Sequence, residues 1–293
     1  MISTLIFMML SFLDLTTVKE PTTSACYDRD YVEVANVEYE NEKYSVVYMQ
    51  RSGQRVRAKY FAAKDYAGNR VHERYENWKN TNTGIILVSS GTYWNEQKLP
   101  EGLTIDNGVI VNQAMVHNKM DALTIVYATG GIVVSDLRER NLKVSGGGID
   151  ASREFDLRGS SRDLRDFKKW AARQEATVFQ THLLVYGDEL KISNNADRTP
   201  RERRFLAVCK NEDGDIIHTI IHRPTFASLY NSTKGTKKFL NDYAEMEVIF
   251  MINIDVGFQD VFELRNWDCS VNKTIKGTKQ ISEAANLLVY YFK

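Results

Sequence analysis

The strongest candidate for chemistry in this chain is a carboxylate that follows an apolar segment. Residues 248–252 are all apolar, and Asn253, Asp255 and Gly257 come directly after them. This pattern predicts a buried strand that ends in a sharp turn at the glycine. A carboxylate at such a strand end has a rigid mount beside a loop, where it could act as a nucleophile or general base. The alternative is that Asp255 only caps the turn through a hydrogen bond to the backbone.

Arginine is concentrated at residues 198–204, immediately before a predicted strand over residues 205–210. A guanidinium group can grip two phosphate oxygens at once, so one of these side chains is a candidate phosphate ligand. Arg203 is the first candidate, with Arg201 and Arg223 as reserves. The alternative is a solvated charged loop, which is what we expect for Arg198 and Arg201.

Two histidines lie in or at the end of apolar segments. His182 interrupts a predicted strand over residues 177–186, where alternation would place it on the same face as Gln180. His222 ends another apolar run. An imidazole with a near-neutral pKa can donate a proton to a leaving oxygen. The alternative is an ordinary hydrogen-bonded histidine, and we expect His72 and His117 at the surface.

Aromatic residues occur in a polar loop that follows an apolar segment at residues 85–88. Thr92, Tyr93 and Trp94 lie in this loop, where the rings could stack on a sugar. The alternative is that these rings pack within the loop. A second acid for catalysis has only weak candidates, which are Asp260 and Glu101.

Composition narrows the class of protein. The chain has 293 residues, 38 basic and 38 acidic, so no net charge favours a nucleic acid or an anionic membrane. Its length fits one large domain or two smaller ones. Three cysteines do not make a disulfide framework, and no spacing of cysteine or histidine resembles a zinc site. We therefore expect no cofactor and no nucleic-acid partner, while a structural divalent cation stays open.

The N-terminal region is ambiguous. Residues 4–13 form an apolar run of signal-peptide length, too short to cross a bilayer as a helix. Small residues precede Cys26, as they do before the cysteine of a bacterial lipoprotein. We expect export to the periplasm or cell surface, with any membrane tether formed by the N-terminus. Lipidation at Cys26 and a short core segment of a cytoplasmic protein are the open alternatives.

The predicted elements favour strands over helices. Hairpin signals occur at residues 107–108 and 130–131, each between apolar alternations. Helical spacing of apolar residues predicts helices over residues 69–79, 163–175 and 236–243. The chain is therefore expected to be α+β, with a large mixed, mostly antiparallel sheet and a few packing helices.

The order of several motifs is more specific than any one of them. They are the loop at residues 90–94 after an apolar strand, the hairpin at 106–108, an arginine entering a strand, the segment 253–257, and a closing strand. In this order they resemble the phosphodiester glycosidase family over residues 84–293. The resemblance implies a hydrolase that cleaves a sugar–phosphodiester linkage on a glycan. Residues 1–30 would then be a leader or tether, and residues 31–83 a small N-terminal subdomain.

The match to the family motifs is incomplete. The family's Asn-Leu-Asp-Gly-Gly-Gly-Ser motif retains Asn253, Asp255 and Gly257, but bulkier residues replace its other glycines. Because a glycine-rich turn lets backbone N–H groups approach an anion, this change leaves open a non-catalytic protein that binds carbohydrate or phosphoglycan. A hydrolase requires its catalytic residues to converge at one open cleft. The expected catalytic residues are Asp255, Arg203 and His182, and the expected substrate-binding residues are Tyr93, Trp94, Thr92, Gln180, Asn253, His222, Arg223 and Asp260.

Overall fold

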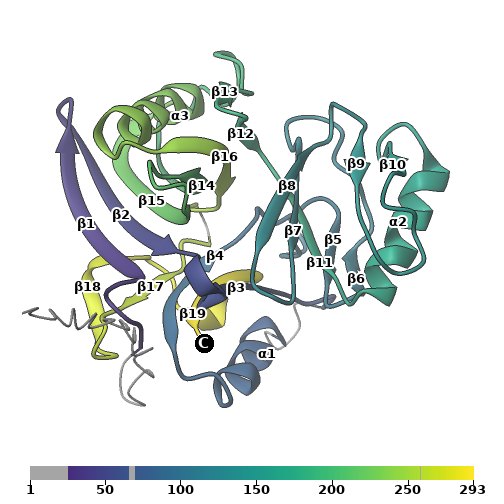
Figure 1. Cartoon of the computed structure of the whole chain (residues 1–293), viewed down its shortest axis with the longest axis horizontal. Coiled ribbons are helices and arrows are strands. Elements are labelled where there is room, and N and C mark those ends of the chain that lie inside the picture. Colours follow the sequence, from purple (N-terminus) through teal and green to yellow (C-terminus); the bar gives the residue numbers. More distant parts are fainter. Residues whose placement is uncertain (1–25, 66–69, 258) are drawn as a thin grey trace, which may run out of the picture.

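The computed structural model describes residues 26–65, 70–257 and 259–293. In these residues, three sheets and their covering helices contain most of the regular structure (Figure 1). Neighbouring strands pair antiparallel, which confirms the expected α+β class. The leader expected at residues 1–30 lies mostly outside the described residues, as does the first residue of the helix expected over 69–79.

Sheet I has seven strands and contains the segments with the candidate arginines and carboxylate. Its order is β1 (Val32–Tyr39), β2 (Glu42–Gln50), β15 (Ile216–Ala227), β14 (Arg201–Lys210), β16 (Glu247–Ile254), β12 (Leu183–Tyr186) and β13 (Glu189–Leu190).

Sheets II and III have five strands each. The order in sheet II is β6 (Val109–Asn112), β5 (Thr104–Asp106), β11 (Thr177–Thr181), β7 (Ala122–Val126) and β8 (Ile132–Asp136). The order in sheet III is β18 (Val271–Lys276), β17 (Phe262–Arg265), β4 (Ile85–Ser90), β19 (Asn286–Phe292) and β3 (Val56–Ala62). The short strands β9 (Leu142–Lys143) and β10 (Glu154–Phe155) pair with each other, and two 3₁₀ turns are η1 (Ser52–Gln54) and η3 (Ile281–Glu283).

The three sheets turn their inner faces toward one shared apolar core. Leu206 of sheet I, Phe179 of sheet II and Tyr290 of sheet III are among its buried members. Each outer face is covered by one helix: α3 (Leu229–Lys238) on sheet I, α2 (Ser161–Arg173) on sheet II and α1 (Arg70–Lys79) on sheet III. In Figure 1, sheet II and α2 lie at one end of the molecule, away from β1 and β2.

Strand alternation in β14 decides which face each arginine occupies. Phe205 and Ala207 pack under α3, whereas Leu206 and Val208 join the shared core. Successive side chains of a strand point to opposite faces, so Arg203 belongs to the α3 face and Arg204 to the core face. The sequence predicts a polar loop up to residue 204, but β14 begins at Arg201 and fixes both side chains.

Several predicted elements are confirmed, including both hairpins, α1 and α2. The third helix is longer than expected: α3 begins at Leu229 and continues into the π-helix η2 (Phe239–Tyr243). The Ser228 side chain starts it by accepting a hydrogen bond from the Asn231 N–H. The segment 31–83 supplies strands to two sheets, since β2 pairs with β15 and β3 with β19. The division expected at residue 83 therefore does not coincide with a boundary between sheets.

A disulfide joins Cys26 to Cys269, which are 243 residues apart in the sequence. The sequence predicts no disulfide framework and does not indicate this single pairing, because spacing along the chain says nothing about contacts across such a distance. The disulfide contradicts lipidation at Cys26, since the sulfur that would carry the lipid is bonded to Cys269. Cys209 is a free buried thiol. None of the described helices is long and apolar enough to cross a membrane.

Candidate functional site

Four segments meet at one end of sheet I. They are the end of β4, the start of β14, the end of β16 and the junction between β11 and β12. The Asp255 N–H donates to the Gly91 carbonyl (2.8 Å), and the Asn253 N–H donates to the His182 carbonyl (3.2 Å). A side chain at position 91 would lie 2.6 Å from both the Asn286 amide and the Tyr60 ring, so only glycine fits there.

His182 lies where the chain passes from sheet II to sheet I. The sequence predicts one strand over residues 177–186, but β11 ends at Thr181 and β12 begins at Leu183 in the other sheet. The alternation that would pair His182 with Gln180 on one face is therefore interrupted. His182 is only partly buried and lies beside the last residues of β16.

The register of β14 and β16 places Asp255 near Arg203. Arg204 is opposite Ile254, and Phe205 is opposite Asn253. Arg203 and Asp255 are the next residues along the two segments, beyond the last pair of the register. Arg203 and Asn253 therefore share the α3 face of sheet I. β16 ends at Ile254, just before Asp255, and the charge of Arg204 acts on the Asp255 carboxyl group.

The Asp255 carboxylate is buried, with 6% of the residue exposed. One oxygen accepts a hydrogen bond from the Gly257 N–H (2.9 Å), and the other accepts one from the Gln259 amide (3.3 Å). The capping role left open by the sequence is thus present. Burial raises the pKa of Asp255 despite these hydrogen bonds, which makes the ionised form a stronger base than an exposed aspartate.

Arg203 is held on one side only. Its Nη2 donates to the Asp197 carboxylate (2.9 Å) and to the Thr199 carbonyl (3.1 Å). Its Nε is buried and has no hydrogen-bond partner among the described residues. The guanidinium group is therefore positioned by Asp197 while part of its donor capacity is unused.

Tyr93, Asn253 and His182 form a contact group beside the acid and the arginine. The Asn253 amide nitrogen donates to the Tyr93 hydroxyl oxygen, which leaves the hydroxyl hydrogen for another acceptor. The Tyr93 and His182 rings meet edge to face, with centroids 5.1 Å apart. In the described part of the chain, Asn253 Oδ1 and His182 Nδ1 are also buried without partners.

Electrostatic effects link these groups into one site. Burial raises the pKa of Tyr93, the nearby Asp255 charge raises it further, and Arg203 opposes this. Burial also lowers the pKa of His182 to about 4, with Asp197 opposing the shift and Arg203 adding to it. His182 is therefore neutral near pH 7, which corrects the expectation of a near-neutral pKa. The charges of Asp255 and Arg203 thus act on Tyr93, and the His182 ring contacts it.

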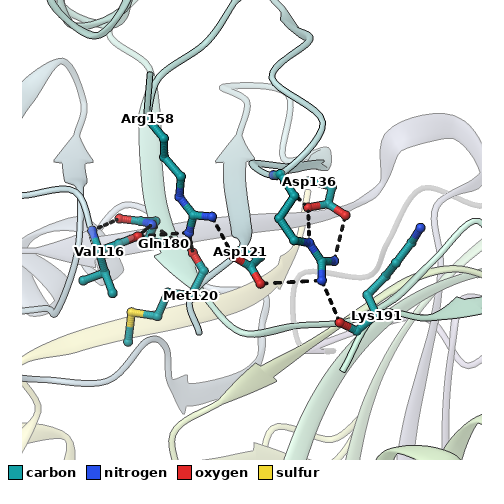
Figure 2. Close-up of polar contacts among 8 residues, drawn as sticks. Val116, Met120, Asp121, Asp136, Arg158, Gln180 and Lys191 are labelled. Atoms are coloured by element: carbon teal, nitrogen blue, oxygen red, sulfur yellow. Dashed lines mark hydrogen bonds and ion pairs between the residues drawn. The ribbon is translucent and has the colours of Figure 1, made fainter. Parts of the chain in front are cut away.

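Two expected substrate-binding residues are used within the fold. The Thr92 hydroxyl is buried and donates to the Gln180 carbonyl. The Gln180 side chain accepts from the Leu103 N–H. It also accepts from the Val116 N–H and donates to the Val116 and Met120 carbonyls (Figure 2). Because each position of this amide already has a backbone partner, Gln180 holds a turn and has no capacity left for a ligand.

Asp260 and His222 lie with Arg204, away from the α3 face. Arg204 is fully buried and forms an ion pair with Asp260 (2.9 Å), whose other oxygen accepts from the Thr278 N–H (2.8 Å). His222 is directly opposite Arg204 in the sheet, and burial lowers its pKa to about 4. Arg204 and Asp260 anchor the loop after Asp255, so the structure gives Asp260 a structural role instead of the expected one. The expected substrate-binding role of His222 stays a prediction.

Arg223 shares a sheet face with Arg203, but its partners are different. It pairs with Glu42 (2.7 Å) and donates to the Ser232 hydroxyl (2.9 Å) at the base of α3. This supports a packing role for Arg223 and leaves Arg203 as the arginine at the site. Arg198 and Arg201 are exposed, as expected.

Trp94 and Glu101 lie on the loop that carries Tyr93. Trp94 is partly buried, with the Lys98 ammonium 5.7 Å from the ring centroid, and forms an isolated bridge with Pro100. The Glu101 N–H donates to the Tyr93 carbonyl (2.7 Å). Sugar stacking by Trp94 stays a prediction, because its observed contacts are within the loop.

Sequence reasoning overlooked two residues that position the candidate catalytic groups. Asp197 orients Arg203, and Gln259 joins the Asp255 carboxylate to the Ala285 N–H (2.9 Å). The local signal for Asp197 was weak, because aspartate in a polar segment is usually a solvated loop residue. Gln259 is fully buried, which only the tertiary structure reveals.

Comparisons with known proteins find structural similarity at low sequence identity. No protein-family model and no curated protein matches this sequence. Among solved structures, the chain is similar to the zebrafish N-acetylglucosamine-1-phosphodiester alpha-N-acetylglucosaminidase catalytic domain, auto-inhibited by its pro-peptide. The identity is 12% and the TM-score 0.49, over 89% of this chain and 82% of that one. A hypothetical protein from Synechocystis is 9% identical with a TM-score of 0.46, over 89% of this chain and 62% of that one. The roles of residues in this chain have to come from its own geometry.

Proposed function

We propose that this chain is an exported hydrolase that cleaves a sugar–phosphodiester linkage on a glycan. The observation that carries the proposal is the gathering of three buried, unpartnered polar atoms around Tyr93, within the described residues. They belong to Arg203, Asn253 and His182, and Asp255 lies among these residues. A cation that binds phosphate oxygens beside a carboxylate that activates the attacking group is what this reaction requires.

In the proposed reaction, Arg203 binds the phosphate through the part of its guanidinium that Asp197 does not occupy. Asp255 takes a proton from a water molecule whose oxygen bonds to the anomeric carbon of the sugar. The bond between that carbon and the phosphate oxygen breaks, and its electron pair goes to the phosphate. The products are a free sugar and a phosphomonoester. The raised pKa of Asp255 supports the base role, because a stronger base accepts the proton more readily.

Tyr93 and His182 act in this scheme as neutral hydrogen-bonding groups. The Tyr93 hydroxyl receives a hydrogen bond from Asn253 and can donate its own hydrogen to a phosphate or sugar oxygen. The His182 ring, neutral because burial lowers its pKa to about 4, packs against Tyr93 and fixes its orientation. Both groups would then stabilise the negative charge that develops on the leaving phosphate.

Export is supported by the disulfide between Cys26 and Cys269. Disulfides form and persist mainly in oxidising compartments, such as the periplasm or the cell exterior. The apolar run at residues 4–13 has the length of a signal peptide. A membrane tether, if one forms, would involve the N-terminal residues and not the sulfur of Cys26.

A non-catalytic protein that binds a carbohydrate or phosphoglycan is the second candidate. The hydrogen bonds of the Asp255 carboxylate support this candidate, because both oxygens already accept hydrogen bonds, one from Gly257 and the other from Gln259. These hydrogen bonds use part of the acceptor capacity of the carboxylate and hold it in the turn. A binding protein would use Asp255 only to shape the turn beside Arg203.

Hydrolysis of a panel of chromogenic sugar phosphodiesters tests the hydrolase proposal. We expect turnover by the full chain and a loss of at least about 100-fold in kcat for Asp255→Asn, in line with the loss of an acid–base catalyst. Arg203→Gln should raise KM and lower kcat, because phosphate binding and charge stabilisation are both lost. Arg198→Ala, an exposed arginine of the same segment, is the matched control and should keep full activity.

The outcome against the hydrolase is an absence of turnover on every substrate by protein whose cooperative thermal unfolding shows that it is folded. If the same protein binds a phosphorylated glycan and Arg203→Gln weakens that binding, the second candidate is correct. If Asp255→Asn keeps full activity, Asp255 is only the cap of the turn.

A further inference from the structure

The turn at residues 116–120 is fastened to Gln180, two residues before His182. The Gln180 Oε1 accepts from the Val116 N–H (3.0 Å), and its Nε2 donates to the carbonyls of Val116 (2.8 Å) and Met120 (2.9 Å) (Figure 2). Gln180 is fully buried, so loss of any of these bonds would leave a desolvated polar group. Both ends of the turn are therefore fixed to the strand that leads to His182.

A second clamp holds the same turn from the other side. Arg158 donates to the Val116 and Met120 carbonyls (3.0 and 2.9 Å) and pairs with Asp121 (2.6 Å). Arg138 lies 3.7 Å from Asp121, pairs with Asp136 (2.7 Å) and donates to the Lys191 carbonyl (2.8 Å). Because Asp136 is in sheet II and Lys191 follows the last strand of sheet I, this network ties the turn to both sheets.

The tip of the clamped turn is exposed and strained. His117, Asn118 and Lys119 are exposed, although the residues on either side are held by buried groups. Lys119 has a φ of 75°, a left-handed conformation that costs a residue with a side chain on the order of 1 kcal/mol or more. The fixed carbonyls of Val116 and Met120 maintain this conformation.

The tip lies beside the candidate active site. The charges of Lys119 and Asp121 both act on the His182 ring, in opposite directions. The hydrogen bonds from Gln180 to Val116 and Met120 independently hold the two ends of the turn two positions from His182. Asp121 is already paired with Arg158, whereas the ammonium of Lys119 is exposed.

We propose that the turn at residues 116–120 is a second wall of the site and that Lys119 binds an anionic oxygen of the substrate phosphate. The identity of this anion rests on the proposed function, whereas the placement of the turn does not. Arg203 is partly neutralised by Asp197, and Asp255 adds a negative charge nearby. A second cation offsets this charge, so Lys119 favours binding of a phosphate group.

The same lysine acts during the reaction. Cleavage of a phosphodiester at the sugar carbon converts a group with one negative charge into a phosphomonoester that can carry two. The ammonium of Lys119 stabilises the added charge as it develops on the leaving oxygen. Lys119 is therefore a specificity residue for substrates in which phosphate, and not a neutral group, is attached to the sugar.

Titration of the full chain with inorganic phosphate, followed by NMR of the His182 ring, tests the proposal without requiring turnover. Phosphate should shift the His182 signals, and Lys119→Gln should weaken phosphate binding by about three- to tenfold, the loss expected for one exposed charge interaction. Lys119→Arg should restore most of the affinity, because the charge is kept. Lys210→Gln alters an exposed lysine at the other end of β14 and is the matched control.

Equal phosphate affinity in the unaltered chain and Lys119→Gln would overturn the proposal. Absence of any phosphate-dependent shift at His182 would overturn it as well. A failure of the hydrolase proposal gives a different result, since phosphate binding would still depend on Lys119 while no phosphodiester is cleaved. The thermal midpoint of Lys119→Gln should match that of the control, because the side chain is exposed.

Discussion

At the scale of single residues, the surroundings of His182 set the charge of the site. Burial disfavours the imidazolium, and Arg203 and Lys119 add positive charge next to it. Asp197 and Asp121 act in the opposite direction but do not compensate. With a pKa of about 4, His182 is neutral over the physiological range, so its ring contacts Tyr93 without adding charge.

This protonation state predicts a pH dependence of stability. Between pH 6.5 and about 4, the unfolded chain binds a proton at His182 that the folded chain does not bind. The stabilisation is therefore present above pH 6.5 and is lost as the pH falls toward 4, by up to about 3 kcal/mol. We expect His182→Gln to lose less stability than the unaltered chain between pH 7 and 4.5, as measured by urea unfolding.

The control for this measurement is His117→Gln, which alters an exposed histidine outside the core. Between pH 7 and 4.5, the free energy of unfolding of His117→Gln should fall by the same amount as that of the unaltered chain. His218 and His222 are also buried with lowered pKa values and contribute in the same direction in every variant. An identical pH dependence for His182→Gln and the unaltered chain would mean that His182 titrates normally in the folded protein.

At the scale of elements, the end of β4 holds the turn that carries Asp255. The Gly91 carbonyl accepts from the Asp255 N–H, the Ser90 hydroxyl donates to the Asp255 carbonyl, and the Asn286 side chain accepts from the Gly91 N–H (3.1 Å). Sheet III thereby sets the position of a residue at the end of sheet I. The close approach of Asn286 and Tyr60 to Gly91 makes this junction sensitive to one methyl group.

Gly91→Ala should therefore destabilise the fold strongly. The added Cβ would lie 2.6 Å from the Asn286 oxygen and from a Tyr60 ring carbon, and neither side chain has room to move. We expect a loss of about 3 kcal/mol or more in the free energy of unfolding. Gly131→Ala is the matched control, because its nearest atom is 3.5 Å away, and it should change stability by less than about 0.5 kcal/mol. Equal midpoints for the two variants in urea would contradict this account of the junction.

Local patterns in the sequence predict a helix or strand well when the whole element belongs to one sheet or packs against one sheet. The apolar spacing of α2 and the Asn107–Gly108 turn are such cases. The strand over residues 177–186 was predicted unbroken, because nothing in its composition indicates that two sheets share it at His182. The start of α3 was missed for a related reason: its first residues include Thr233 and Gly235, which favour helix weakly, and packing under sheet I overrides this preference.

The candidate site residues also differ in how far local sequence predicts them. Asp255, Arg203 and Asn253 could be predicted because each lies at or near the end of a recognisable strand. Asp260 and Gln180 were misassigned because the sequence gives their polarity but not their partners. A buried ion pair with Arg204 and a backbone clamp around Val116 use those side chains completely. Partners of this kind come from chain segments far apart, which only the tertiary structure brings together.

At the scale of the whole molecule, three sheets share one core while the site lies where their ends meet. Phe179 of sheet II, Leu206 of sheet I and Leu288 of sheet III are all buried in that core. Movement of any sheet would thus displace part of the site: Tyr93 follows sheet III, Arg203 belongs to sheet I, and Lys119 is anchored to sheet II. Catalysis of the proposed kind depends on such rigid placement, because small displacements of reacting groups reduce the rate greatly.

The disulfide between Cys26 and Cys269 acts at this same scale. It ties the first described residue to the turn between β17 and β18, and so closes a loop over most of the chain. A cross-link over 243 residues restricts the unfolded chain strongly, so its removal should cost about 3–5 kcal/mol. We expect the double variant Cys26→Ser/Cys269→Ser to unfold at lower urea concentration than the unaltered chain. A thiol reductant should lower the midpoint of the unaltered chain to that of the variant and leave the variant unchanged. If reductant has no effect on the unaltered protein, although thiol titration shows the bond to be broken, then sheet packing alone holds this end of the chain and the cross-link has no role in stability.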